Sequence, residues 1–142
     1  MYIPEHENGW APKMKNFDMK NQLWLPPLTV RPATPTVTYL GGGTRKKEGN
    51  GAYIYIYGYK NAELSIDSLP FDFGEGATDV RITALEFAPS NDKQGYVVTS
   101  TGNVFVTTDA GSSWVKKARP EKLGGHYFHG NAMVIDPHKP AN

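Results

Sequence analysis

The chain has 142 residues, which is enough for one domain with a buried core. Its 15 Lys and Arg residues against 14 Asp and Glu residues, a formal net charge of +1, argue against a nucleic-acid-binding surface, because such surfaces carry a basic excess or stripe. Cysteine is absent, which excludes disulfides and thiolate metal sites, and no apolar run approaches the length of a membrane helix. We therefore expect no membrane span and no thiolate metal site, and the sequence suggests no cofactor or other metal centre.

Residues 1–22 form the first predicted segment, an irregular N-terminal arm. They are polar, contain Pro4, Gly9 and Pro12, and show no hydrophobic period. The first residues also lack the basic-then-apolar pattern of a signal peptide. The chain is therefore expected either to stay inside the cell or to be a mature or internal piece of a longer protein.

A short repeat begins after this arm. Residues 28–32, 85–89 and 133–137 each read apolar, any, apolar, any, proline. This pattern predicts a short strand that ends at the proline, which has no N–H group for the β-ladder. After the first two prolines the same number of positions leads to Tyr39 and to Tyr96, each within a second predicted strand.

Two units of four strands follow from this spacing. Third strands are predicted at residues 53–57 and 104–107, and fourth strands at 62–66 and 114–117. The first unit covers residues 23–76, the second covers 77–121, and 122–142 are expected to start a third unit with one strand. Residues 44–51 lengthen the loop between the second and third strands of the first unit. The predicted fold class is all-β.

Residues 107–114 are the most distinctive stretch of the second unit. The carboxylate of Asp109 can accept N–H groups of its own loop, Gly111 can take a positive φ, and Trp114 can fold back as an apolar plug. With Thr107 they resemble the Asp-box, or BNR repeat, which is a structural turn on the rim of a β-propeller blade. A catalytic or metal-binding Asp109 is the alternative, but the turn spacing favours the structural role.

A decayed copy of this turn is expected in the first unit. There Tyr59, Asn61 and Leu64 are predicted to stand where the second unit has the aspartate, the glycine and the tryptophan. Leu64 would then be the surviving apolar plug.

The repeat is similar to the WD40/YVTN/BNR-like propeller family, loosely over residues 28–142 and well over 82–142. The resemblance implies that each unit is a propeller blade. A closed propeller needs at least about four blades, so two blades and one strand imply an incomplete propeller, completed by the rest of a longer protein or by other chains. The family includes sialidases, xyloglucan-degrading hydrolases, sortilin-type receptors and a photosystem assembly factor, so the fold does not determine the function.

The acidic residues between the two units are the main candidates for catalysis. Glycoside hydrolysis needs two carboxylates about 5–10 Å apart. Two of Asp67, Asp72, Glu75 and Asp79 could form such a pair, but a solvated connection is the favoured interpretation of this segment. A sialidase would also need an arginine cluster, and the chain has only four arginines, Arg31, Arg45, Arg81 and Arg119.

Two aromatic groups are candidates for binding. His126, Tyr127 and His129 follow a Gly-Gly pair and are predicted to lie on a loop that could contact a ligand; no third metal ligand is evident, so no metal site is assigned. Tyr53, Tyr55, Tyr57 and Tyr59 alternate with isoleucines and therefore share one face of a strand. That face is either a platform for glycan or peptide or, as we favour, a packing surface between blades.

The leading functional prediction is a non-catalytic scaffold or recognition segment of a larger β-propeller protein, one that binds glycan or protein through its loops. The resemblance implies a secreted or cell-surface location. Part of a glycoside hydrolase and an assembly factor that grips a protein partner are the alternatives. Ligand contacts are expected in the loops at residues 44–51, 71–79 and 124–130.

Overall fold

The computed structural model describes residues 19–20, 22–32, 37–45, 49–60, 63–118 and 132–140, without the side chains of 59–60 and 63–64. The described part is all-β, as the sequence predicts, and it contains no helix. Its strands are β1 (Leu28–Arg31), β2 (Val37–Gly41), β3 (Ile54–Lys60), β4 (Glu63–Ser68), β5 (Ile82–Ala88), β6 (Asn91–Thr99), β7 (Val104–Thr107) and β8 (Val115–Lys117).

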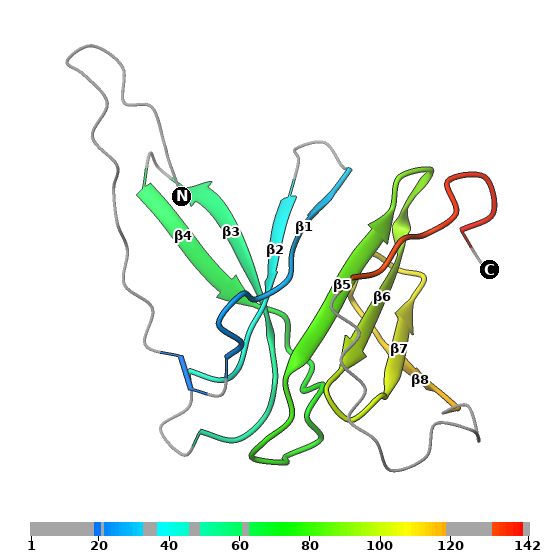
Figure 1. Cartoon of the computed structure of the whole chain (residues 1–142). Coiled ribbons are helices and arrows are strands. Elements are labelled where there is room, and N and C mark those ends of the chain that lie inside the picture. Colours follow the sequence, from blue (N-terminus) through cyan, green and yellow to red (C-terminus); the bar gives the residue numbers. More distant parts are fainter. Residues whose placement is uncertain are drawn as a thin grey trace.

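The strands form two four-stranded antiparallel sheets in which each strand pairs with its neighbour in the sequence, β1-β2-β3-β4 and β5-β6-β7-β8 (Figure 1). The first strands of both sheets end directly before a proline, at Pro32 and Pro89. A proline cannot donate to the ladder, which accounts for the shared boundary. The predicted grouping of the strands into two sets of four is therefore confirmed.

The two faces of the first sheet follow from its register. Paired residues of an antiparallel sheet point to the same side, so Thr29, Tyr39 and Ile56 share one face. Tyr39, Ile54 and Ile56 pack into the core against the second sheet, and we call this side the inner face. The opposite side is the outer face, and its members are Leu28, Val30, Thr38, Leu40, Tyr55, Tyr57, Ile66 and Ser68.

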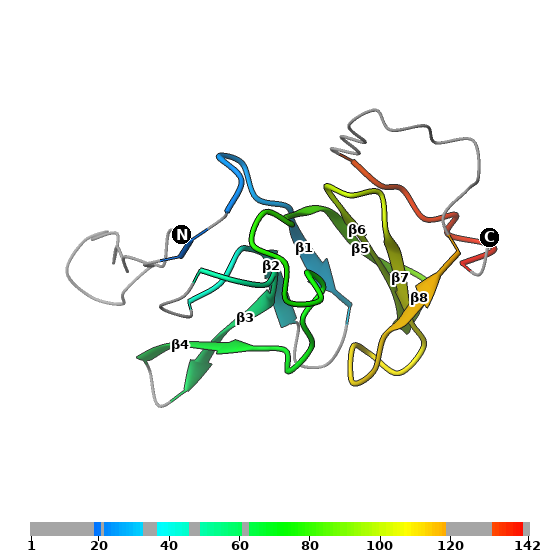
Figure 2. The same cartoon turned by 90° about the horizontal axis from the view of Figure 1, so that it is seen from below.

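The second sheet turns its own apolar face toward the first. Leu85, Val97 and Phe105 are paired across three strands and lie in the same core as the inner face. The other side of the second sheet, which we call the far face, includes Tyr96, Val106 and Val115. The two sheets therefore stack face to face, and Figure 2 shows them side by side and fanned apart toward β4 and β8.

Aromatic side chains fill the space between the sheets. Phe73, from the β4–β5 connection, is fully buried and meets Phe105 and Trp114 edge to face, with ring centroids 5.3 and 5.0 Å apart. Phe71 packs on both phenylalanines. The connection thus contributes its own side chains to the core, in addition to joining the sheets.

The two first strands are neighbours at the narrow end of the stack. The Thr29 hydroxyl donates a 3.1 Å hydrogen bond to Glu86, and Arg31 lies 3.6 Å from the Asp92 carboxylate. The rings of Tyr39 and Phe87 have centroids 4.9 Å apart. Hydrophobic and polar contacts together hold β1 beside β5.

Two expectations from the sequence are wrong in detail. Residues 133–137 form no strand; Ile135 is buried, but the segment has no ladder partner among the described residues, and a single strand without a neighbour gains no backbone hydrogen bonds. In the first sheet, β3 continues to Lys60 and β4 begins at Glu63, so Tyr59 pairs with Leu64 inside the ladder. Neither residue occupies a turn like that of Asp109, because both belong to paired strands.

Candidate functional site

Asp109 is the centre of a hydrogen-bonded turn between β7 and β8. Its Oδ1 accepts the Thr107 hydroxyl at 2.7 Å and the Ser113 N–H at 2.9 Å, and its Oδ2 accepts the Ser113 hydroxyl at 2.6 Å. The Thr107 hydroxyl oxygen in turn accepts the N–H of Gly111 at 2.9 Å. The carboxylate therefore holds the two ends of the turn together.

The same contacts explain the acidity of this carboxyl group. Hydrogen bonds from the Ser113 side chain, the Ser113 backbone and the Thr107 hydroxyl lower the pKa of Asp109 from 3.8 to about 2. A general acid in hydrolysis needs a raised pKa instead, so Asp109 is suited to a structural role.

Backbone geometry and Trp114 complete the turn. Gly111 has φ 89° and Ala110 has φ 62°, so the chain passes through the left-handed region at two successive residues. The Trp114 indole N–H donates to the Gly111 carbonyl at 3.2 Å, and its ring is buried against Phe73 and Phe87. The turn predicted for Thr107, Asp109, Gly111 and Trp114 is therefore formed, with the tryptophan inserted between the sheets.

Asp72 organises the connection between the sheets. Its Oδ1 accepts the N–H groups of Ala52 at 2.9 Å and Gly74 at 2.8 Å, and its Oδ2 accepts that of Gly76 at 3.0 Å. A side chain at Gly51 would meet both carboxylate oxygens at 2.8 Å, and this residue has φ 87°. Asp72 is thus committed to backbone groups and is not free to act as a nucleophile or base.

The remaining acidic candidates are not gathered into a site. Asp67 and Asp79 are exposed, on β4 and just before β5 respectively. Glu75 forms a salt bridge with Lys116. No group of three His, Asp or Glu residues that could hold a metal ion occurs in the part of the chain that the structure describes.

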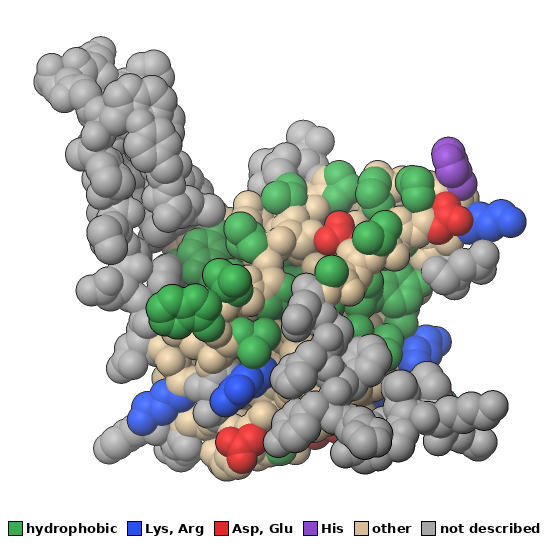
Figure 3. Space-filling model, in the orientation of Figure 1, with side chains coloured by type: hydrophobic (Ala, Val, Ile, Leu, Met, Phe, Trp, Pro, Cys, Tyr) green, Lys and Arg blue, Asp and Glu red, His purple; other side chains and the backbone are tan. Residues whose placement is uncertain are grey.

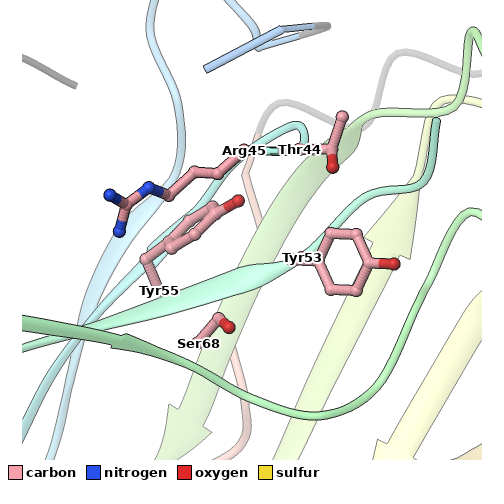
Figure 4. Close-up of a pocket in the computed structure, with 5 residues that line it drawn as sticks. All are labelled: Thr44, Arg45, Tyr53, Tyr55 and Ser68. Atoms are coloured by element: carbon pink, nitrogen blue, oxygen red, sulfur yellow. The ribbon is translucent and has the colours of Figure 1, made fainter. Parts of the chain in front are cut away.

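A cleft of about 410 Å³ opens at one end of the outer face, lined by Thr44, Arg45, Tyr53, Tyr55 and Ser68 (Figure 4). Arg45 lies next to Tyr55 in this view. The Tyr55 ring is buried, its hydroxyl donates to the Gly43 carbonyl at 3.4 Å, and burial raises the pKa of Tyr55 and of Tyr57. Thr44 and Arg45 therefore meet Tyr53 and Tyr55 in one cleft.

A second cleft of about 340 Å³ lies where residues 23–27 pass the second sheet, and its lining is Leu23, Trp24, Leu25, Pro27 and Thr83. The Trp24 side chain is 95% exposed and that of Leu25 is 80% exposed. Figure 3 shows hydrophobic side chains gathered over this segment and β1. Contact of such a large apolar ring with water is thermodynamically unfavourable, and exposed apolar patches often mark binding sites.

Sequence reasoning did not single out Trp24. The available signal was a Leu-Trp-Leu run directly before two prolines, which keep the segment out of a ladder and leave its side chains exposed. By contrast, His126, Tyr127 and His129 lie outside the described residues, as does the predicted loop that carries them.

Comparisons of the chain with models of known protein families, with curated proteins and with solved structures return no match. Within its described ranges the chain has no helix long and apolar enough to cross a membrane. The site must therefore be interpreted from its own geometry.

Proposed function

We propose that the two sheets are adjacent blades of a BNR-type β-propeller and that the chain is a non-catalytic scaffold and recognition module. The architecture is supported by two equivalent four-stranded meanders that stack face to face with their first strands side by side. The turn at residues 107–114, placed between the third and fourth strands of the second sheet, adds to this support. A secreted or cell-surface location belongs to the same proposal.

The observation that carries the recognition role is the exposed Trp24 beside its cleft. Large aromatic side chains supply much of the binding energy of protein interfaces when they become buried. The lining is apolar apart from Thr83, and a sugar would need several hydrogen-bonding groups to replace its bound water. The cleft therefore suits an apolar side chain of a protein partner better than a glycan.

The committed carboxylates weigh against the hydrolase alternative. Asp72 is bound to three backbone N–H groups and Asp109 lies in a turn with a lowered pKa, so neither is arranged for acid–base catalysis. No observation in the described residues favours a glycosidase over a binding module.

Selection of binding peptides from a phage-displayed library, with a glycan array probed in parallel, tests the recognition role. Wild-type protein should enrich peptides with aromatic or aliphatic anchors, and Trp24→Ser should lose at least about tenfold in affinity for the selected peptides, since burial of an anchor contributes more than 1.4 kcal/mol. Val134→Ser, a change at another exposed apolar residue, is the matched control. Glycan binding without peptide binding, or sugar release from a polysaccharide panel, would contradict the proposal.

A further inference from the structure

The outer face of the first sheet is largely apolar, and it is exposed along β1. Leu28 is 61% exposed and Val30 is 49% exposed, although both belong to a strand that flanks the core. The paired positions across this face, from Leu40 to Ser68, contain no charged side chain. These paired positions can therefore be buried against another protein without stranding a charge, whereas the cleft at one end of the face is lined by the charged side chain of Arg45.

The equivalent face of the second sheet is covered over β5, β6 and β7. In the repeat, Leu28 and Val30 correspond to Leu85 and Phe87, which are 4% and 1% exposed. The inner face of the first sheet covers these two residues. The same pattern of side chains is therefore buried where a neighbouring sheet is present and exposed where none is.

The cleft beside Tyr55 is a further difference between equivalent positions of the two sheets. Tyr55 pairs with Leu40 as Phe105 pairs with Val97, so the two aromatic residues occupy equivalent positions. Phe71 and Phe73 pack on Phe105, whereas Tyr55, itself buried, forms one wall of the open cleft. The cleft is thus the position that a neighbouring sheet's connection would fill.

The far face of the second sheet corresponds to the inner face of the first, although it also carries Glu86 and Lys117. Tyr96 and Val106 stand at the positions of Tyr39 and Ile56, which form the inner face. Val115, paired with Val106, is 59% exposed. Residues 132–140 touch this face at Tyr96, whose hydroxyl donates to the Pro140 carbonyl, but they form no ladder with it.

We propose that the outer face of the first sheet docks a second copy of this chain through the far face of that copy's second sheet. The contact repeats, between molecules, the packing that joins the two sheets within one molecule. Two such contacts in one dimer join four sheets into a ring, and four is near the smallest number of blades that forms a closed propeller. The inference rests on the proposed propeller architecture and adds the partner that completes it.

Single charges introduced into each face test this head-to-tail contact. Val30→Asp alters the outer face and Val115→Asp alters the far face; both residues are exposed, so neither change should unfold the monomer. Ser90→Asp, at an exposed position just after β5, is the matched control. Circular dichroism melting verifies that all three variants are folded, and sedimentation velocity over a concentration series measures association.

Wild type and Ser90→Asp should sediment as dimers, and each valine variant alone should weaken association at least about tenfold, because a charge would be buried without a partner. Mixing the two valine variants should restore a heterodimer, since one intact pair of faces remains. A monomeric wild type would overturn the proposal. A dimer whose association is unchanged by Val115→Asp would also overturn the proposal, because it would indicate contact between two outer faces. Peptide binding at Trp24 is measured in a separate assay, so the recognition proposal and the dimer proposal can fail independently.

Discussion

At the level of single residues, the conspicuous side chains of this protein serve its own backbone. Asp109 and Asp72 each accept hydrogen bonds that close a loop, and both loops place an aromatic ring in the shared core, Trp114 in one case and Phe73 in the other. A carboxylate that accepts several donors is stabilised in its charged form. The acidic residues are therefore important for stability even where they are exposed.

The lowered pKa of Asp109 predicts a specific dependence of stability on pH. Because the pKa is about 2 in the folded state and 3.8 ordinarily, the stabilising contribution is complete above about pH 4 and is lost as the pH falls through about 2. Urea unfolding at a series of pH values from 5 to about 2 should show the wild type and Asp109→Asn converging toward low pH. A constant difference between them across this range would show that the turn does not depend on the charged carboxylate.

At the level of elements, the β4–β5 connection acts as part of the core. It places Phe71 and Phe73 between the sheets and is held by Asp72, which also accepts the N–H of Ala52 just before β3. One side chain therefore ties the connection to the first sheet.

Asp72→Ala should remove this tie and destabilise the protein by about 2 kcal/mol, because it leaves partly buried N–H groups without their acceptor. Asp72→Asn keeps one acceptor oxygen, so its loss should be smaller. Chemical denaturation monitored by tryptophan fluorescence measures both. Equal effects of the two substitutions would mean that charge, and not the hydrogen-bond geometry, is what matters at this position.

At the level of the whole molecule, the two sheets share one aromatic core and should unfold together. Phe73 lies between them and is fully buried, so Phe73→Ala should cost about 3–5 kcal/mol and lower the stability of both sheets. Far-ultraviolet circular dichroism and intrinsic tryptophan fluorescence should report coincident transitions in the wild type and in the variant. Two separate transitions would show that the sheets are independent, which would also weaken the comparison between inner and outer faces.

The sequence by itself determined the all-β class, the eight strands and their grouping into two sheets. These properties follow from local signals: alternation of apolar residues, prolines that end β1 and β5, and the turn chemistry of residues 107–114. The hairpin of the first sheet was mispredicted, since aligning it with that turn ignored the option of longer strands that pair Tyr59 with Leu64.

Only the tertiary structure decided which face of each sheet is covered. Leu28 and Leu85 have the same local pattern, but the first is exposed and the second is buried, because burial depends on whether another sheet lies opposite. The same holds for Asp72, whose backbone partners come partly from a distant loop, and for the exposed Trp24. Contacts between segments far apart in the chain leave no periodic trace in the sequence, so the candidate binding surfaces became visible only once the sheets were stacked.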